Sequence, residues 1–490
     1  MKKKILCLAL CVVMVFASLV GCEEESREKI MNDIGRDASK GAITVTMHLL
    51  SEKPVSAEQE ALVEAAVNEY MDDYNIYLDL KYFTEAPIYE NGVLVKNGYY
   101  EALEYSLDMM IKKAAEDKAN KKNPNKATES ETVDATAETT GDVTDETTGD
   151  ATGETTEATA TTAATDATVE EGTLAIETDE FGNEKYLYID ENGLPKVYYP
   201  PNPDYHVDIF YFSGYDRYLK YKEAGYLNNF TNTMNSKTSQ AVKHGVSYVY
   251  YDAVKKLNSN YDMMPCNTQV GEYTYLLLNK EVLESANYTV EMVGKLESAD
   301  LVSFMNFVKE NYTEYAPFYS NQQTLPAAFN GFTSATDKNA KFAVGYVKGD
   351  IAIQDEYAAL GYEVVVLEKP VLETADVYEN VFAISSYTKQ IAKTYLVMYE
   401  LYTNENIINL LAHGVEGTNY VWTNSTERDP DNGYEFYKVV EPITDDPKHV
   451  YVMDASKIGN SARVYPTIAD NPRRVQNILN QNSEATFVKN

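Results

Sequence analysis

The residue types that most often carry out chemistry are scattered along this chain without a catalytic or metal-binding pattern. The sequence contains no H-E-x-x-H, G-x-S-x-G, Walker A or paired C-x-x-C motif. Its five histidines stand alone, and a lone histidine is more often structural than a ligand. They are His48, His206, His244, His413 and His449. We therefore predict no enzyme activity, no metal site and no cofactor.

The many acidic residues do not change that prediction. The segment from Asp429 to Gly433 (DPDNG) looks like part of a calcium loop. Its glycine comes one position too early and no glutamate stands at the twelfth position, so a solvated turn is predicted instead. Carboxylate pairs are frequent in so acidic a chain, and they cannot by themselves indicate glycosidase chemistry.

Tyrosine provides a better basis for ligand binding. The chain holds 41 tyrosines, 15 phenylalanines and a single tryptophan, Trp422. Tyrosine combines a ring face that stacks on a ligand with a hydroxyl that hydrogen-bonds to it. Trp422 follows a turn at Glu416-Gly417 that would present it to a ligand, although core packing explains such a residue equally well. The pattern favours recognition of a polar ligand.

The N-terminus has the pattern of a secretion signal that ends in a lipid-bearing cysteine. Lys2 to Lys4 is basic, Ile5 to Val20 is apolar, and Leu19-Val20-Gly21-Cys22 has the form of a lipobox. The apolar run is short for a bilayer span and lacks basic anchors at its end, which disfavours an uncleaved membrane anchor. We predict a signal peptide over residues 1–21, lipid on Cys22, a tether over residues 22–42, and a location on the extracellular face of the cell membrane.

The chain is strongly acidic, with a formal net charge of −34, and removal of the signal peptide would take away lysines but no acid. Such a surface disfavours nucleic acid as a partner. After processing, Cys22 and Cys266 would remain, and a lipid on Cys22 excludes a disulfide within the monomer.

Strands and helices alternate after the tether. Ile43 to Leu50 is predicted as a strand, Ala57 to Tyr74 as a helix capped by Ser56, and Ile76 to Phe83 as a second strand. This strand–helix–strand order predicts a parallel sheet and an α/β fold. The apolar side of the helix is expected to hold Leu62, Ala65, Ala66, Tyr70 and Met71.

A low-complexity segment interrupts this alternation. A helix is predicted from Tyr99 to Ala115, and residues 117–171 then form an insertion rich in threonine, alanine and acids. Such a segment buries too little apolar surface to offset its ordering entropy, so we predict that it is disordered. A surface insertion is one interpretation of its role, and a glycosylated or wall-spanning spacer is the other. A small β-meander over residues 173–199 and a buried strand from Val207 to Phe212 follow.

The stretch from Val381 to Trp422 holds a dense run of predicted elements. A strand from Val381 to Ile384 is followed by Ser385 or Ser386 as a helix N-cap, and Thr403 or Asn404 caps a second helix. The first of these helices is expected to place Ile391, Tyr395, Met398 and Tyr402 on one stripe.

The order of these segments resembles that of the family 1 extracellular solute-binding proteins of ABC importers. The resemblance is carried by the lipobox, by the first strand and its long helix, and by four further segments. These are VDIFYFSGYDRYLKYKEAGYLNNFT (Val207 to Thr231), MPCNTQVGEYTYLLLNKEVLE (Met264 to Glu284), FAISSYTKQIAKTYLVMYELYTNENIINLLAHGVEGTNYV (Phe382 to Val421) and YVMDASKIGN (Tyr451 to Asn460). The acidic insertion departs from the family pattern, and the resemblance predicts further helices beyond Asn490.

The resemblance implies a two-lobed α/β fold of the type II periplasmic-binding-protein kind, which closes on a ligand in a central cleft. Residues 43–116 and 172–266 are expected mainly in lobe 1, residues 267–380 mainly in lobe 2, residues 381–409 back in lobe 1, and residues 410–490 as a cleft-lining turn and C-terminal segment. Ligands of such folds lie at the carboxyl ends of strands. The predicted ligand-binding residues are His48, Ser213, Tyr215, Asn267, Tyr273, Glu416, Tyr420 and Trp422.

By the same resemblance, the chain is expected to be a lipid-anchored monomer that captures a carbohydrate or oligosaccharide outside the cell. It would deliver this solute to the subunits of a membrane permease. A peptide or another polar solute stays open as ligand. The alternative function is a surface lipoprotein for adhesion or sensing that uses the same fold without transport, and an enzyme that cleaves glycans has little support.

Overall fold

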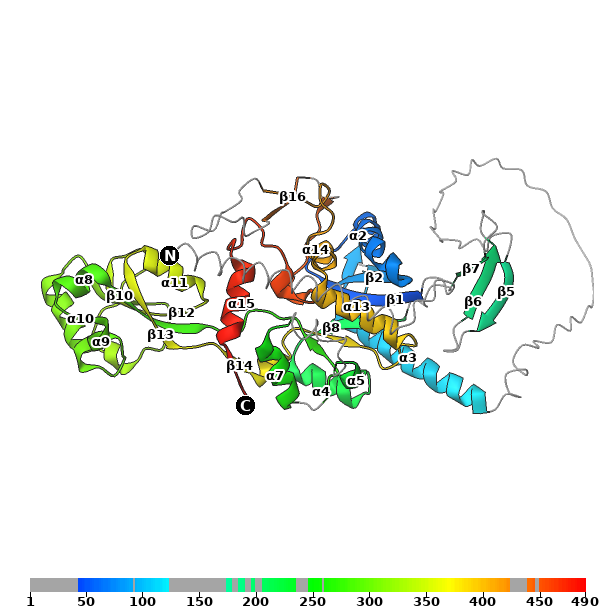
Figure 1. Ribbon diagram of the computed structural model, residues 1–490, viewed down its shortest axis with the longest axis horizontal. Helices are drawn as coiled ribbons and strands as arrows, with labels where there is room; N and C mark the ends of the chain where they lie inside the picture. Colours follow the sequence, from blue (N-terminus) through cyan, green and yellow to red (C-terminus); the bar gives the residue numbers. More distant parts are fainter. Residues whose placement is uncertain are drawn as a thin grey trace, which may run out of the picture.

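The computed structural model describes residues 43–90, 93–122, 173–178, 184–189, 195–198, 205–234, 246–257, 260–423, 439–445 and 449–490. The α/β class predicted from the sequence is confirmed, since strands and helices alternate through these ranges. A five-stranded and a four-stranded sheet form the centres of two lobes (Figure 1). The signal peptide, Cys22, the tether, most of the predicted insertion and the Asp429–Gly433 turn lie outside the described residues.

The first sheet begins with the predicted strand–helix–strand unit. β1 (Ile43–Ser51) and β2 (Ile76–Thr84) pair in parallel over their whole length, and α2 (Ala57–Met71) connects them. Ser56 caps α2 as predicted, because its hydroxyl accepts a hydrogen bond from the Gln59 amide at 3.3 Å. The parallel pairing confirms the topology inferred from the sequence.

Three further strands complete this sheet in the order β2-β1-β8-β15-β9. β8 (Ile209–Phe212) runs parallel to β1, whereas β15 (Val381–Ile384) is antiparallel to β8 and to β9 (Met264–Pro265). All residues of β8 and β15 are buried, because helices cover both faces of the sheet. Among these helices, α3 (Tyr99–Lys122) and α13 (Ile391–Thr403) contact β1.

The second lobe is built on the sheet β11-β12-β10-β13. Its strands are β10 (Tyr273–Asn279), β11 (Ala316–Ser320), β12 (Phe342–Gly349) and β13 (Tyr362–Glu368). Alternate residues of β10 enter two separate apolar clusters, as the pleat of a strand requires. Leu276 packs with α10 (Ala299–Asn311), and Tyr275 packs in the cluster that holds Tyr357 of α11 (Ala352–Ala359).

The two lobes have separate apolar cores, because the clusters around β10 share no residue with the large cluster around β1 and β8. Within the described ranges, no helix combines the length and apolar character needed to cross a bilayer. The predicted residue boundaries of the lobes stay a prediction.

The remaining elements are short or peripheral. The strands on either side of the turn predicted at Glu90-Asn91-Gly92, β3 and β4, pair antiparallel, while Asn91 and Gly92 lie outside the described residues. β5, β6 and β7 form the predicted meander. The other strands are β3 (Ile88–Glu90), β4 (Val93–Lys96), β5 (Thr173–Thr178), β6 (Glu184–Ile189), β7 (Pro195–Tyr198), β14 (Val371–Glu373), β16 (Tyr420–Trp422), β17 (Val440–Pro442) and β18 (Thr486–Val488). The other α-helices are α4 (Tyr215–Glu223), α5 (Thr231–Met234), α7 (Tyr248–Leu257), α8 (Lys280–Ser285), α9 (Val290–Val293), α12 (Thr374–Val377), α14 (Glu405–His413) and α15 (Arg474–Glu484).

The structure corrects the apolar side predicted for α2. The buried residues of this helix are Gln59, Val63, Val67, Asn68 and Met71, so the predicted stripe is right only for Met71. The apolar pattern of the sequence predicted the wrong side of the helix, because a polar residue of α2, Asn68, faces the sheet. Asn68 accepts a hydrogen bond from the Leu78 amide at 2.7 Å and donates one to the Leu78 carbonyl at 2.9 Å.

Two predicted helix boundaries are also wrong. α3 continues past Ala115 to Lys122, in a stretch of good helix formers where Lys113 and Asp117 form an ion pair at 3.6 Å. α13 begins only at Ile391, because the Ser385 hydroxyl accepts a hydrogen bond from the Tyr387 amide at 3.2 Å and shapes a turn instead of a cap.

α13 also lacks the one-sided pattern expected for it. Every residue from Thr394 to Thr403 is buried, whereas Ile391 of the predicted stripe is 42% exposed. The cap predicted for the next helix is confirmed at Asn404, whose side-chain oxygen accepts hydrogen bonds from the amides of Asn406 and Ile407 at 3.1 and 3.4 Å.

Candidate functional site

Loops from all five strands of the first sheet meet at one edge. β1, β2 and β8 run in parallel, so their carboxyl ends lie together. β15 starts at the same edge, where Val381 pairs with both Phe212 of β8 and Pro265 of β9. We call this the carboxyl edge. It is the place where a fold of this kind can gather side chains from distant segments.

A guanidinium group stands in the first turn after β8. The Arg217 Cζ atom lies 3.4 Å from the centre of the Tyr100 ring, and an Arg217 nitrogen donates a hydrogen bond to the Ser213 carbonyl at 2.9 Å. Burial raises the pKa of the Tyr100 hydroxyl, and the positive charge of Arg217 counteracts this rise. Among the described residues, Arg217 has no ion pair with a carboxylate. Its remaining N–H groups can therefore serve a ligand.

A second polar group of this edge is Asn380, which is held by a residue of β8. The Tyr211 hydroxyl donates a hydrogen bond to the Asn380 side chain at 2.6 Å, just before β15. The Asn380 carbonyl accepts a hydrogen bond from the Cys266 amide at 2.8 Å, which ties the end of β9 to the same place. Tyr211 is itself buried, and burial raises its pKa above the usual range, so its hydroxyl stays protonated and positions the Asn380 side chain by donating to it.

The C-terminal segment also reaches this edge, because the Ser461 amide donates to the Cys266 carbonyl after β9 at 3.2 Å, and the segment carries the carboxylate of Asp454. Asp454 is one of the charges that act on Tyr211. Its burial alone would raise the carboxyl pKa, but hydrogen bonds from Ser456 and the Lys457 ammonium at 3.3 Å outweigh that effect and lower it. Asp454 is therefore an ionised acceptor of hydrogen bonds at neutral pH.

Three tyrosines form an aromatic platform at the same edge. The ring of Tyr215 lies 6.2 Å from that of Tyr218 in a stacked arrangement and 5.0 Å from that of Tyr378. Tyr218 and Tyr378 are buried, and Tyr215 is 41% exposed. The Gly214 amide donates to the Tyr378 carbonyl at 2.7 Å, which holds Tyr215 at the start of α4. The platform thus offers one ring to a ligand and two rings behind it as support.

Two of the predicted ligand-binding residues, Ser213 and Tyr215, belong to this carboxyl edge. Three others lie inside the protein. His48 is in the middle of β1 with its ring 4.9 Å from Phe83, and Tyr273 is buried in β10 of the other lobe, stacked on Tyr275 at 5.3 Å.

Asn267 follows β9 but is fully buried. Its side chain accepts a hydrogen bond from the Ser247 amide at 2.9 Å and donates one to Asn460 at 2.7 Å. The structure thus gives His48, Asn267 and Tyr273 internal contacts, and a contact of these residues with solute stays a prediction.

The last three predicted residues lie in a separate turn over α14. Glu416 is exposed, Tyr420 is buried, and Trp422 is partly buried in β16. The buried Asn419 organises this turn, since its side chain accepts from the Val415 amide at 2.7 Å and donates to the His449 carbonyl at 2.9 Å. Figure 1 shows β16 well apart from β8, on the other side of α13 and α14. The structure does not bring this turn together with Ser213 and Tyr215.

Trp422 has a structural role that can be measured. Its ring makes edge contacts with Tyr420 at 5.4 Å and with Tyr465 at 5.2 Å. We expect Trp422→Ala to lower the free energy of unfolding by about 1–2 kcal/mol, because two aromatic contacts and part of a buried surface are lost. Urea denaturation of the free protein checks this. An unchanged stability would contradict it, and the variant's solute affinity separately tests the ligand contact predicted from the sequence.

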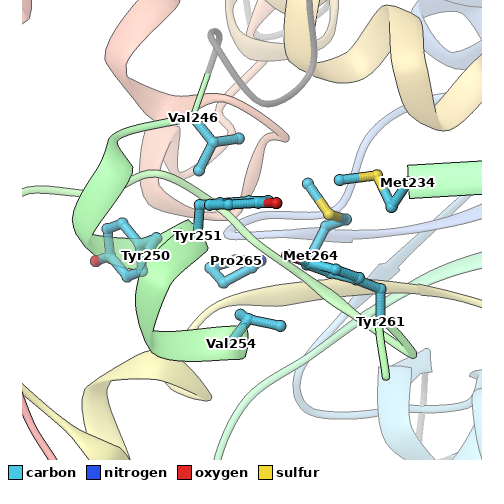
Figure 2. A pocket seen from close by; sticks show the side chains of 8 residues that line it. All are labelled: Met234, Val246, Tyr250, Tyr251, Val254, Tyr261, Met264 and Pro265. Carbon is cyan, nitrogen blue, oxygen red and sulfur yellow. The ribbon is translucent and has the colours of Figure 1, made fainter. Parts of the chain in front are cut away.

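An apolar pocket lies elsewhere in the first lobe, between α5, α7 and β9. Figure 2 shows the side chains around it, which include no charged group. They belong to Met234, Val246, Tyr250, Tyr251, Val254, Tyr261, Met264 and Pro265. Such a lining does not offer the convergent polar groups that hold a hydrophilic solute. We therefore place the candidate site at the carboxyl edge.

Sequence reasoning missed four residues of this edge: Tyr100, Tyr211, Arg217 and Asp454. Arg217 carried a usable signal, since it follows Tyr215 closely in the first turn after a buried strand. Tyr100 and Asp454 come from segments far apart in the sequence, and only the folded chain places them near β8.

Comparison with known proteins gives distant structural likenesses. No family model matches the chain, and no curated protein matches it. Among solved structures, the N-glycan transport solute binding protein (NgtS) of Streptococcus pneumoniae has a TM-score of 0.40 at 12% identity, covering 91% of this chain and 83% of its own. A family 1 extracellular solute-binding protein of Alicyclobacillus acidocaldarius has a TM-score of 0.29 at 11% identity, covering 75% and 78%.

An enzyme, thiaminase I of Bacillus thiaminolyticus, is also similar, with a TM-score of 0.27 at 9% identity and coverage of 91% and 94%. The first two structures are solute-binding proteins, the class that the sequence predicts. These identities and TM-scores are low, and the likenesses carry no conclusion about the function of this chain.

Proposed function

We propose that this chain is the solute-binding component of an importer, which captures a carbohydrate or oligosaccharide outside the cell and delivers it to a membrane permease. The observation that carries this proposal is the carboxyl edge, where the first turn of α4 carries both an exposed tyrosine ring and a guanidinium group free of carboxylate partners in the described residues. The site has neither a nucleophile–base pair nor a metal-binding cluster among the described residues, so binding without chemistry fits it best.

Each group of the edge matches a feature of a sugar. The apolar face of a pyranose ring stacks on an aromatic ring, for which Tyr215 is the exposed candidate. Arg217 and the Asn380 amide can donate to hydroxyl oxygens, and the Asp454 carboxylate can accept from hydroxyl groups. Ser213 comes just before Tyr215 and Arg217 at the end of β8, and its hydroxyl can do either. A ligand with many hydroxyls and one apolar face satisfies all of them.

The membrane side of the proposal rests on the sequence. The lipobox at Cys22 would anchor the chain to the outer face of the membrane. The tether that follows would let the folded lobes reach a permease. We propose that the chain acts as a monomer in this arrangement.

A thermal-shift screen of the folded protein against neutral mono- and oligosaccharides tests the function. A sugar that binds only the folded state raises the melting temperature, and the rise grows with the logarithm of its concentration above the dissociation constant. We expect at least one oligosaccharide to do so, with its dissociation constant then measured by calorimetry. Failure of every sugar at millimolar concentration would count against carbohydrate import and favour the adhesion or sensing alternative.

Variants of the carboxyl edge locate the site. We expect Arg217→Gln and Tyr215→Ala each to weaken sugar binding about tenfold, because each removes a direct contact worth roughly 1–2 kcal/mol. Lys220→Gln is the matched control on the same helix, since Lys220 is 58% exposed and its partner Glu104 lies 2.7 Å away on α3. If the control weakens binding as much as Arg217→Gln, the sugar does not lie at this edge.

A further inference from the structure

The chain crosses between the two lobes at two places that lie against each other. One crossing leads from β9 to β10 through residues 267–272, and the other leads from β13 through β14 towards β15. They touch at Gly271, where an added Cβ atom would lie only 2.9 Å from the Val371 carbonyl oxygen, and Gly271 has a positive φ of 47°. Close contact at this point requires a glycine.

The C-terminal helix α15 lies across these crossings. Figure 1 shows it between the two sheets, and the strand that follows it, β18, pairs with β14 of the second crossing. At the start of the helix, an Arg474 nitrogen donates to the Ser461 carbonyl at 3.2 Å and so attaches α15 to the first lobe.

Gln481 of α15 bonds to both sides of this junction. Its side-chain nitrogen donates to the carbonyls of Val270 and Gly271, at 2.8 and 2.7 Å. Its side-chain oxygen accepts from the amide of Ile351, at 2.9 Å, just before α11 of the second lobe. Gln481 is fully buried, so water cannot replace these hydrogen bonds when they break. The polar groups would then stay buried without partners, which costs free energy.

Asn482 secures the same crossing to the first lobe. Its side chain accepts from the Val270 amide at 2.8 Å and donates to the Thr268 carbonyl at 2.8 Å and to the Ser247 hydroxyl at 3.1 Å. The side-chain amides of Gln481 and Asn482 thus satisfy backbone groups of residues 268–271, a part of the first crossing that belongs to neither main sheet. Rotation of the second lobe against the first must strain or break the Gln481–Ile351 bond, which is the bond of this set that reaches the second lobe.

We propose that α15 is a clasp that couples the two lobes, with Gln481 as the positioning residue that transmits movement between them. The Arg473–Asp355 ion pair, 3.2 Å long, joins the same two elements, but its side chains are 39% and 79% exposed and it contributes little. The coupling therefore depends on the buried amide. The clasp sets how readily the lobes change their angle, and its effect on solute affinity rests on the proposed function.

Differential scanning calorimetry of the full folded chain tests the coupling without any ligand. The wild type should unfold in one transition, because the clasp makes the lobes one cooperative unit. Gln481→Met keeps the size of the side chain but removes its hydrogen bonds, and we expect two transitions separated by several degrees. Gln476→Met is the matched control, since Gln476 is an exposed residue of the same helix and should leave one transition.

Hydrogen exchange on the wild type covers the case in which Gln481→Met does not fold. The amides of Ile351 and Val270, which donate to the clasp, should exchange through the same opening as the amides of α15. The proposal would be overturned if the Ile351 amide exchanged together with the core of the second lobe and independently of α15. It would also be overturned if Gln481→Met unfolded in one transition.

A binding measurement separates this inference from the proposed function. With a sugar found in the thermal-shift screen, Gln481→Met should weaken binding about tenfold, because a smaller share of molecules holds the competent angle. If wild type binds sugar and Gln481→Met binds it equally while unfolding in one transition, the clasp is wrong and the function stands. If two transitions occur but no sugar binds the wild type, the clasp stands and the function is wrong.

Discussion

Replacing Gly459 with alanine is expected to lower the free energy of unfolding by about 3 kcal/mol or more. The φ of Gly459 is +35°, and a Cβ atom built on it would lie 2.2 Å from the carbonyl oxygen of Leu401 in the buried helix α13. The same carbonyl accepts a hydrogen bond from the Asn460 amide at 3.0 Å. The C-terminal segment therefore lies so close to α13 that no side chain fits between them.

The loss should extend beyond the local clash. Asn460 is fully buried, donates to the Tyr402 carbonyl at 3.1 Å and accepts from Asn267 at 2.7 Å after β9. Displacing Gly459 would pull this asparagine away from both partners. The unpaired buried groups then add their desolvation cost to the steric one.

Gly417→Ala is the control for the steric argument. Gly417 also has a positive φ, of +77°, but a Cβ atom there meets no other atom within 4 Å. Only backbone strain of about 1–2 kcal/mol is expected from this change. Urea denaturation measures the free energy of unfolding of both variants. Equal losses of that free energy would show that close contact with α13 is not the reason for a glycine at position 459.

The helices and strands could be predicted from the sequence wherever one local pattern decided them. β1 begins with β-branched residues and β2 alternates between apolar and polar ones, at the spacing of a strand–helix–strand unit, and β15 is apolar between polar neighbours. The predictions failed where a side chain has a distant partner. Asn68 faces the sheet because Leu78 of β2 offers it two backbone groups, and no local pattern contains that information.

The candidate site could be predicted only in part, for the same reason. Ser213 and Tyr215 follow directly from β8, so strand order alone places them at the carboxyl edge. Tyr100 joins them because α3 packs beside α4, a contact across more than a hundred residues and the acidic insertion. Trp422 was predicted as a ligand contact because it is the single tryptophan after a turn, but its rarity in the sequence says nothing about which surface it faces.

Lowering the pH should destabilise this protein already at pH values above those at which carboxylates take up protons, because two histidines are buried in neutral form. Burial, with smaller contributions from Lys81 and His206, lowers the pKa of His48 to about 3, although Asp208 opposes this. Burial lowers the pKa of His413 to about 4, against the hydrogen bond to the Tyr465 carbonyl at 2.9 Å. The Nδ1 atom of His48 has no hydrogen-bond partner in the described part of the chain.

The sign of the effect follows from the direction of these shifts. In the unfolded chain both histidines take up a proton near pH 6.5, whereas in the folded chain they remain neutral down to much lower pH. The unfolded state therefore binds more protons as the pH falls below about 6.5, and stability decreases. Between pH 7.5 and pH 5.0 each histidine should cost about 2 kcal/mol of unfolding free energy.

Urea denaturation at these two pH values measures the effect, and single variants assign it. His48→Met removes one titrating group from the core of β1, so the loss of stability between the two pH values should shrink by about 2 kcal/mol. His413→Gln should reduce this loss of stability by a similar amount. The new side-chain amide can still donate a hydrogen bond to the Tyr465 carbonyl, so the variant removes the titrating group and keeps the contact. The pH window stays above the usual range of carboxyl pKa values, so Asp and Glu contribute little to the difference. The same pH dependence in His48→Met as in the wild type would mean that the imidazole in β1 is not the group that acid protonates on unfolding.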